Sequence, residues 1–187
     1  QMTLEEKIAQ MIQPEQSAIS YEEIAKYDVG SVLSGGGSAP ASGNTAEDWQ
    51  QHIDNIKRAA AGSRLGIPVL YGVDAVHGHN NVYGAVIYPH NIGLGAANDA
   101  ELMEKIGTAV AEEVRATGIQ WTFAPTLANP QNELWGRTYE GFGEDVDIVA
   151  ELGTAFIKGA QGEKDSAAYL DDAHVLATAK HYIGEGY

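Results

Sequence analysis

The sequence contains no cysteine, few basic residues and no long apolar run. Without cysteine the chain has no disulfide, no thiolate nucleophile and no cysteine-ligated zinc site. No stretch reaches the roughly 20 apolar residues that a membrane helix requires. The amino terminus, Gln1 to Leu4, also lacks the basic and apolar regions of a signal peptide. We therefore expect a globular chain that does not cross a membrane.

Positive charge is scarce in this chain. Lys and Arg together number 11 against 26 Asp and Glu, which gives a formal net charge of -15 at pH 7. A nucleic-acid backbone and an anionic membrane surface carry the same sign, so both would be repelled. The sequence thus predicts no nucleic-acid and no membrane partner, whereas neutral or cationic ligands are compatible with it.

Four segments have the apolar spacing of amphipathic helices. They begin near Thr3, Thr45, Asp99 and Glu144, each at a side chain suited to cap or open a helix. In the first of them four apolar residues share one face: Leu4, Ile8, Met11 and Ile12. We expect these four helices to turn their apolar stripes toward one core.

Apolar stretches between the helices predict strands at residues 29–33, 68–73, 119–124 and 175–179. The stretch that ends at Val73 has no polar alternation, which is typical of a parallel strand buried on both faces. Strands that alternate with helices indicate a parallel α/β architecture. The alternation fits either a doubly wound sheet or a (β/α)8 barrel.

Polar side chains follow three of the predicted strands. Asp74 comes directly after the second strand, Arg137 lies beyond the third, and Lys180 and His181 follow the last. Loops after the strands of a barrel line one mouth, so we expect these residues to converge there. A carboxylate, two fixed cations and an imidazole provide the acceptors and donors that a neutral polyhydroxylated ligand needs. Other polar residues in the same loops are His77, His79, Asn80, Asn81, Tyr139 and Glu140.

The pair His77 and His79 supports a rival hypothesis, a metal-dependent hydrolase. Further ligands would have to come from other strand ends, but His52 lies in a predicted helix and His90 in a proline-containing loop. We therefore favour a structural, polar-network role for the pair and expect no metal. Zinc retained in stoichiometric amount after equilibration would revive the rival hypothesis.

Two other motifs have simpler interpretations than ligand binding. The loop from Gly35 to Gly37 lacks the Lys-Ser/Thr ending of a P-loop and the spacing of a dinucleotide motif, so we expect a turn near the mouth. Trp135 and Trp121 are candidate platforms for a sugar face. Trp121 lies within a predicted strand, and we expect it in the core.

Several motifs, in order along the chain, resemble glycoside hydrolase family 3. The longest runs from Tyr71 to Ala85 and continues from Tyr88 to Gly95, and its His-Gly-His-Asn-Asn wording is most similar to the exo-acting β-glucosidase and glucan exohydrolase branch. The others are Thr3-Leu4-Glu5-Glu6-Lys7-Ile8, Gln10-Met11, Glu113 to Ile119, Phe123-Ala124-Pro125, Trp135-Gly136-Arg137, Tyr139-Glu140, Gly143-Glu144-Asp145 and Ala179 to Gly186.

The resemblance implies that residues 1–187 form a single partial domain, the N-terminal half of a (β/α)8 TIM-type barrel. The rest of the barrel, in the same or a second chain, and a second domain would then be missing. It further implies that Asp74, Arg137, Lys180 and His181 bind the terminal non-reducing glucosyl unit of a β-linked gluco-oligosaccharide or glucoside. A periplasmic or extracellular location would follow from the same resemblance.

The resemblance also implies a retaining mechanism without metal or cofactor, in which an aspartate attacks the anomeric carbon and a glutamate acts as acid and base. The family's nucleophile lies in a Ser-Asp-Trp type motif downstream of Lys-His, and its acid/base glutamate comes from a second domain. Neither position exists in this chain, and Asp48-Trp49 lies upstream in a predicted helix. We therefore expect residues 1–187 alone to be inactive. A non-catalytic carbohydrate-binding module derived from such a barrel is the alternative.

Overall fold

The computed structural model describes residues 1–182 and 184–186. Its sheet consists of three short parallel strands in chain order: β1 (Ser31–Ser34), β2 (Leu70–Val73) and β3 (Trp121–Thr122). Two further segments extend this sheet through isolated parallel bridges. Glu15 pairs with Leu33 beside β1, and Leu176 pairs with Trp121 beside β3.

The order of these five segments distinguishes the two architectures that the sequence left open. Each segment lies beside the one that precedes it in the chain, and all of them run parallel. A doubly wound sheet reverses its strand order at a switch point, whereas a (β/α)8 barrel adds its strands in sequence. The fold is therefore the N-terminal half of a barrel, as predicted.

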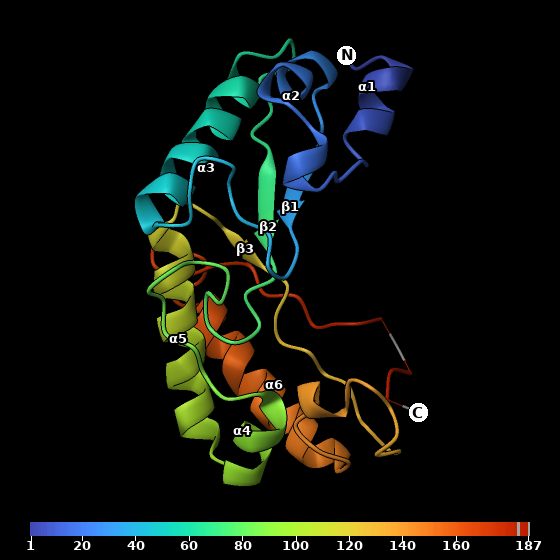
Figure 1. Cartoon of the computed structure of the whole chain (residues 1–187), viewed down its shortest axis with the longest axis vertical. Helices are drawn as coiled ribbons and strands as arrows, with labels where there is room; N and C mark the ends of the chain where they lie inside the picture. The colour runs from blue at the N-terminus through green and yellow to red at the C-terminus, as the bar shows by residue number, and fades with distance from the viewer. Residues whose placement is uncertain (183, 187) are drawn as a thin grey trace.

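Helices connect the strands and cover one face of the sheet. Figure 1 shows α3 and α5 along one side of the strands, with α6 packed beside α5. The helices are α1 (Leu4–Ala9), α2 (Tyr21–Tyr27), α3 (Ala46–Ala61), α4 (Asn91–Ala97), α5 (Ala100–Ala116) and α6 (Val146–Gln161), with 3-10 turns η1 (Gln16–Ala18) and η2 (Thr138–Glu140). The helices predicted to begin near Thr45 and Asp99 are confirmed, and both residues are side-chain caps.

The core lies between the sheet and these helices. Val32, Tyr71 and Val73 point toward the helices and are buried, and they meet fully buried residues of α3 such as Trp49 and Ile53. On the other face, Leu33, Leu70 and Trp121 are only half-buried, whereas Gly72 is buried beneath the Phe123 and Trp121 rings. One face of the sheet is thus packed, while the other, which would be the interior of a closed barrel, is partly open.

The structure differs from the sequence-based expectation in four details. The third strand spans Trp121–Thr122 rather than 119–124, and residues 175–179 form bridged extended chain rather than a strand. A segment at the edge of a sheet has hydrogen-bonding neighbours on one side only, which explains its irregularity. Two short helices, α2 and α4, were not predicted, because seven residues are too few to show the spacing of apolar side chains that marks a helix.

The apolar face of the first helix is the fourth difference. Leu4 is 69% exposed and Met11 is 79% exposed, and the helix ends already at Ala9. The predicted stripe therefore does not pack into the core of this chain. In the described part of the chain, no helix combines the length and apolar character needed to span a bilayer.

Candidate functional site

Asp74 and Lys180 meet at the carboxyl end of the sheet. Asp74 follows the last residue of β2, and its backbone N–H donates to the Ser34 carbonyl at 3.0 Å. Lys180 forms a parallel bridge with Thr126, beyond the end of β3. The Lys180 Nζ lies 2.7 Å from Asp74 Oδ1, with side-chain exposures of 12% and 28%. The two predicted residues therefore form a largely buried ion pair 106 positions apart in sequence.

Glu140 fixes the orientation of the Arg137 guanidinium. Arg137 directly precedes η2, and its Nε and Nη2 donate to the two carboxylate oxygens of Glu140 at 2.8 and 2.5 Å. This bidentate hydrogen bonding lowers the pKa of the Glu140 carboxyl and raises that of the guanidinium. Such a fork fixes the plane of the guanidinium, because both donors are engaged in one carboxylate.

The His181 side chain is 41% exposed, nearly as much as that of Arg137. Its Nδ1 lies 2.6 Å from Glu185 Oε2, and its backbone N–H donates to the same oxygen at 3.2 Å. Glu185 Oε1 in turn accepts from Arg137 Nη1 at 3.4 Å. One carboxylate thus joins the imidazole to the guanidinium.

All four predicted residues belong to one cluster. Asp74 pairs with Lys180, and Arg137 is linked to His181 through Glu185. The two pairs are joined through the chain itself, because Lys180 and His181 are consecutive residues. The cluster presents carboxylate acceptors and cationic donors side by side, which suits a ligand rich in neutral hydroxyls.

A row of rings borders the cluster. The ring centroids of His77 and His90 lie 4.1 Å apart, and those of His90 and Tyr139 lie 4.7 Å apart, both edge to face. Burial, followed by the nearby His90, lowers the pKa of His77. His77 is therefore neutral at pH 7, and its buried Nδ1 has no hydrogen-bond partner among the described residues.

His79 points into the core, away from this row. It is 1% exposed, its Nε2 lies 2.9 Å from Thr117 Oγ1, and its ring packs on Trp49 at 5.7 Å. Burial lowers the pKa of His79 to about 4. The two histidines of the motif thus occupy separate environments. Within residues 1–182 and 184–186, no group of three His, Asp or Glu side chains is arranged to hold a metal ion.

The glycine loop lies against Asp74. The Asn81 side chain holds it from both sides, because its Nδ2 donates to the Gly35 carbonyl and its Oδ1 accepts from Gly37 N, each at 2.9 Å. A Cβ on Gly36 would lie 3.6 Å from Asp74 Oδ2. The loop is therefore a turn beside the cluster, as the sequence predicted.

The two tryptophans differ from the expectation in part. Trp121 is half-buried rather than fully buried, donates from Nε1 to Thr178 Oγ1 at 2.7 Å, and packs edge to face on Phe123 at 4.8 Å. A Cβ on Gly72 would lie 2.9 Å from the Trp121 ring, so this ring covers the open face of the sheet. Trp135 is also half-buried.

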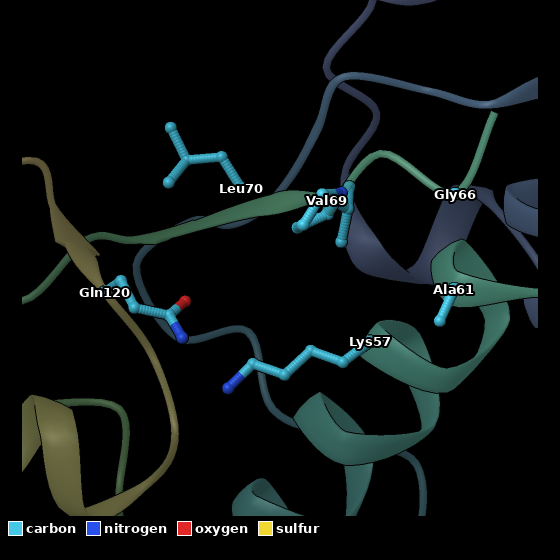
Figure 2. Close-up of a pocket in the computed structure, with 7 residues that line it drawn as sticks. Lys57, Ala61, Gly66, Val69, Leu70 and Gln120 are labelled. Carbon is cyan, nitrogen blue, oxygen red and sulfur yellow. The ribbon is translucent and has the colours of Figure 1, made fainter.

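A pocket of about 390 Å³ lies at the other end of the strands. Figure 2 shows Lys57 and Gln120 extending into it, near Val69 and Leu70 at the start of β2. Lys57 Nζ donates to the Gly118 carbonyl at 2.8 Å, and burial lowers its pKa. The pocket is remote from Asp74 and contains none of the predicted site residues.

Glu185 was not recognised from the sequence as part of the site. It occurs in the motif that ends at Gly186, but nothing in the motif specifies what its side chain contacts. The only hint in the sequence was its position four residues after His181, between two glycines that allow a turn back toward the imidazole. Contacts across a 48-residue separation, such as that with Arg137, require the fold.

Comparison with known proteins identifies relatives over almost the whole chain. Residues 3–187 match the family described as "Glycosyl hydrolase family 3 N terminal domain". The lysosomal beta glucosidase of Dictyostelium discoideum is 35% identical over 205 residues, a match that covers 98% of this chain and 24% of that protein.

Solved structures give the same result. An exo-1,3/1,4-beta-glucanase from a Pseudoalteromonas species superposes with a TM-score of 0.93 at 47% identity, covering 99% of this chain and 24% of that one. A beta-glucosidase from Listeria innocua, solved in complex with glucose, superposes with a TM-score of 0.74 at 28% identity, covering 97% and 25%. The chain therefore spans about a quarter of the length of these relatives.

Proposed function

The chain belongs to glycosyl hydrolase family 3, and from this premise we propose that it is part of a retaining exo-β-glucosidase. The complete enzyme would hydrolyse terminal non-reducing β-D-glucosyl residues from oligosaccharides or glucosides. The relatives support this choice, since they include a beta glucosidase and an exo-1,3/1,4-beta-glucanase.

The role that we propose for this segment is the innermost glucose-binding subsite. The observation that carries it is the single cluster of Asp74, Arg137, Lys180 and His181 at the carboxyl ends of the strands. Asp74 accepts hydrogen bonds from sugar hydroxyls, while Lys180 and Arg137 donate to them. Asp74 Oδ1 is already paired with Lys180, and Oδ2 faces the glycine loop. The ion pair with Lys180 fixes the carboxylate before the ligand arrives.

Bond cleavage is assigned to groups outside this segment. In the proposed double displacement, a carboxylate nucleophile forms a covalent glycosyl intermediate and a second carboxyl group first protonates the leaving oxygen, then activates water. The described cluster binds and orients the terminal glucosyl ring for both steps. Its own carboxylates are already engaged by Lys180, Arg137 and His181, which suits binding better than nucleophilic attack.

We further propose that residues 1–187 are one partial domain and that the rest of the barrel, in the same or a second chain, completes it. The half-open face of the sheet supports this, as does Leu176, which is 36% exposed at its edge. A groove of about 420 Å³ next to α1 and α2 adds a second uncovered apolar surface, lined by Ile8, Ile12 and Tyr27 among others. Barrel closure removes edges of this kind.

Replacing Asp74 by Ala in the complete enzyme tests the subsite. Hydrogen bonds to a charged group contribute roughly 1.5–3 kcal/mol each. Loss of two of them should lower kcat/KM for an aryl β-glucoside by about 10²-fold or more. Asp74→Asn, which keeps the shape and one carbonyl acceptor, should fall between Asp74→Ala and the wild type.

Asp172→Ala is the matched control, because Asp172 also pairs with a cation, Arg115 at 3.1 Å, but is fully exposed and outside the cluster. Its kcat/KM should equal that of the wild type. Unchanged kcat/KM in Asp74→Ala would refute the subsite. A wild-type protein that binds glucose but releases none from any β-glucoside would favour the carbohydrate-binding module instead.

A further inference from the structure

We propose that Glu185 is a positioning residue that aligns Arg137 and His181 as one unit toward the sugar. The inference rests on the proposed function, because it concerns how that same subsite is organised. The two carboxylate oxygens of Glu185 bind different partners: Oε1 accepts from Arg137 Nη1, and Oε2 accepts from His181. Among the described side chains, no other is hydrogen-bonded to both of these residues.

The backbone around Glu185 is itself fixed. Its carbonyl accepts from Asn129 N at 3.2 Å, and the next carbonyl, of Gly186, accepts from Gln131 N at 2.8 Å. Gly186 has φ 98°, and a Cβ there would lie 2.7 Å from the Asn129 carbonyl group. The turn is thus pressed against the segment that follows β3. With a side chain only 18% exposed, the carboxylate of Glu185 has little freedom to move.

Glu185 determines which hydrogen bonds His181 can offer. A carboxylate only accepts hydrogen bonds, so the His181 Nδ1 at 2.6 Å must carry the hydrogen. In the neutral ring Nε2 then has a free lone pair, and it accepts a hydrogen bond from a hydroxyl. The 41% exposed side chain leaves this nitrogen accessible to a ligand. Without Glu185 the ring would be free to adopt either tautomer and to rotate.

Glu185 also limits the directions of the Arg137 donors. A guanidinium has five N–H groups. Three hydrogen bonds occupy Nε, Nη2 and Nη1, the last of them to Glu185. Two N–H groups therefore remain for sugar hydroxyls, in a plane that Glu140 and Glu185 fix. Arg137 and His181 are therefore oriented through a common anchor, and a change at that anchor displaces both.

The test uses Glu185→Gln and Glu185→Ala in the complete enzyme, with Glu163→Gln as matched control. Glu163 also pairs with a cation, Lys158 at 3.5 Å, but at an exposed site. We expect kcat/KM for an aryl β-glucoside to fall about 10-fold in Glu185→Gln and about 100-fold in Glu185→Ala, because small misplacements of binding groups have effects of this size. The control should match the wild type. Rates are normalised to active sites titrated with a mechanism-based inactivator, so that loss of folded protein does not mimic the effect.

A double-mutant cycle separates positioning from general support of the fold. If Glu185 acts through His181, then Glu185→Gln should reduce kcat/KM much less in a His181→Ala background than in the wild type. Purely additive effects, or kcat/KM within about twofold of wild type in Glu185→Ala, would overturn the inference. A loss in Asp74→Ala without a loss in Glu185→Ala would overturn it while leaving the proposed function intact.

Discussion

His77 and His79 stand two positions apart in one motif, yet their surroundings are opposite. His77 borders the cluster and packs on His90, whereas His79 is buried against Trp49 and Thr117. The chain turns between them at Gly78, whose φ is 80°, so the two side chains leave the backbone in different directions. The sequence predicted a polar-network role for the pair. It had no means to show that one ring belongs to the site and the other to the core.

The burial of His79 makes the stability of the protein depend on pH. Its pKa is about 4 in the folded chain against an ordinary value of 6.5, so the unfolded chain takes up the proton first as the pH falls. The free energy of unfolding is therefore highest above pH 6.5 and falls between pH 6.5 and 4, by roughly 2 kcal/mol from pH 7 to pH 5. His79→Gln should flatten this dependence.

Urea unfolding of the complete enzyme at pH 7 and pH 5, followed by tryptophan emission, measures the effect, since Trp49 contacts the His79 ring. The wild type should lose more stability on acidification than the variant. An equal pH dependence in the two proteins would show that His79 does not titrate in this window.

At the scale of residues, the sequence predicted the four candidate site residues but not the contacts among them. Asp74 is recognisable because it follows an apolar strand, and Lys180 because it ends another apolar stretch. Their 2.7 Å contact depends on two strand ends that meet only in the fold. Glu185 was missed for the same reason, since its partner Arg137 lies 48 residues earlier.

Among the elements, the long helices were predictable and the short ones were not. α3 and α5 carry both an N-terminal cap and an apolar stripe over about four turns, and the two signals agree. α4 has no side-chain cap and contains Gly93 and Gly95, which are poor helix formers. Its formation depends on packing: a Cβ on Gly95 would lie 1.6 Å from the Phe142 carbonyl oxygen.

Close approach of α5 to α6 depends on two glycines. A Cβ on Gly107 would lie 2.4 Å from the Phe156 carbonyl oxygen, and one on Gly159 would lie 2.0 Å from that of Glu104. Gly107→Ala should therefore force the helices apart and lower the free energy of unfolding by roughly 1–3 kcal/mol. The urea midpoint of the complete enzyme is the measurement.

Gly93→Ala in α4 is the matched control, because its Cβ would meet only Pro89 Cβ at 3.5 Å, an ordinary contact. This exchange should leave stability unchanged or raise it by about 0.5–1 kcal/mol, since Ala favours the helix. If Gly107→Ala proved as stable as Gly93→Ala, the close helix contact would not be a constraint on the fold.

For the whole molecule, the strand order turned an ambiguous α/β pattern into a barrel. Alternating strands and helices fit two architectures, and the succession of parallel neighbours from Glu15 to Leu176 agrees with the barrel that the family resemblance implies. For the first helix, the sequence predicted a longer stripe than the structure has, because α1 ends at Ala9 and Met11 and Ile12 lie beyond it, and Leu4 and Met11 are exposed.

We propose above that this segment binds the terminal glucosyl ring. The most direct measurement is a crystal structure of the complete enzyme with bound glucose. We predict sugar hydroxyls within about 3 Å of the Asp74 carboxylate, Lys180 Nζ, His181 Nε2 and the free N–H groups of Arg137. Glucose bound elsewhere, with no hydroxyl in hydrogen-bond contact with Asp74 or Lys180, would contradict the account.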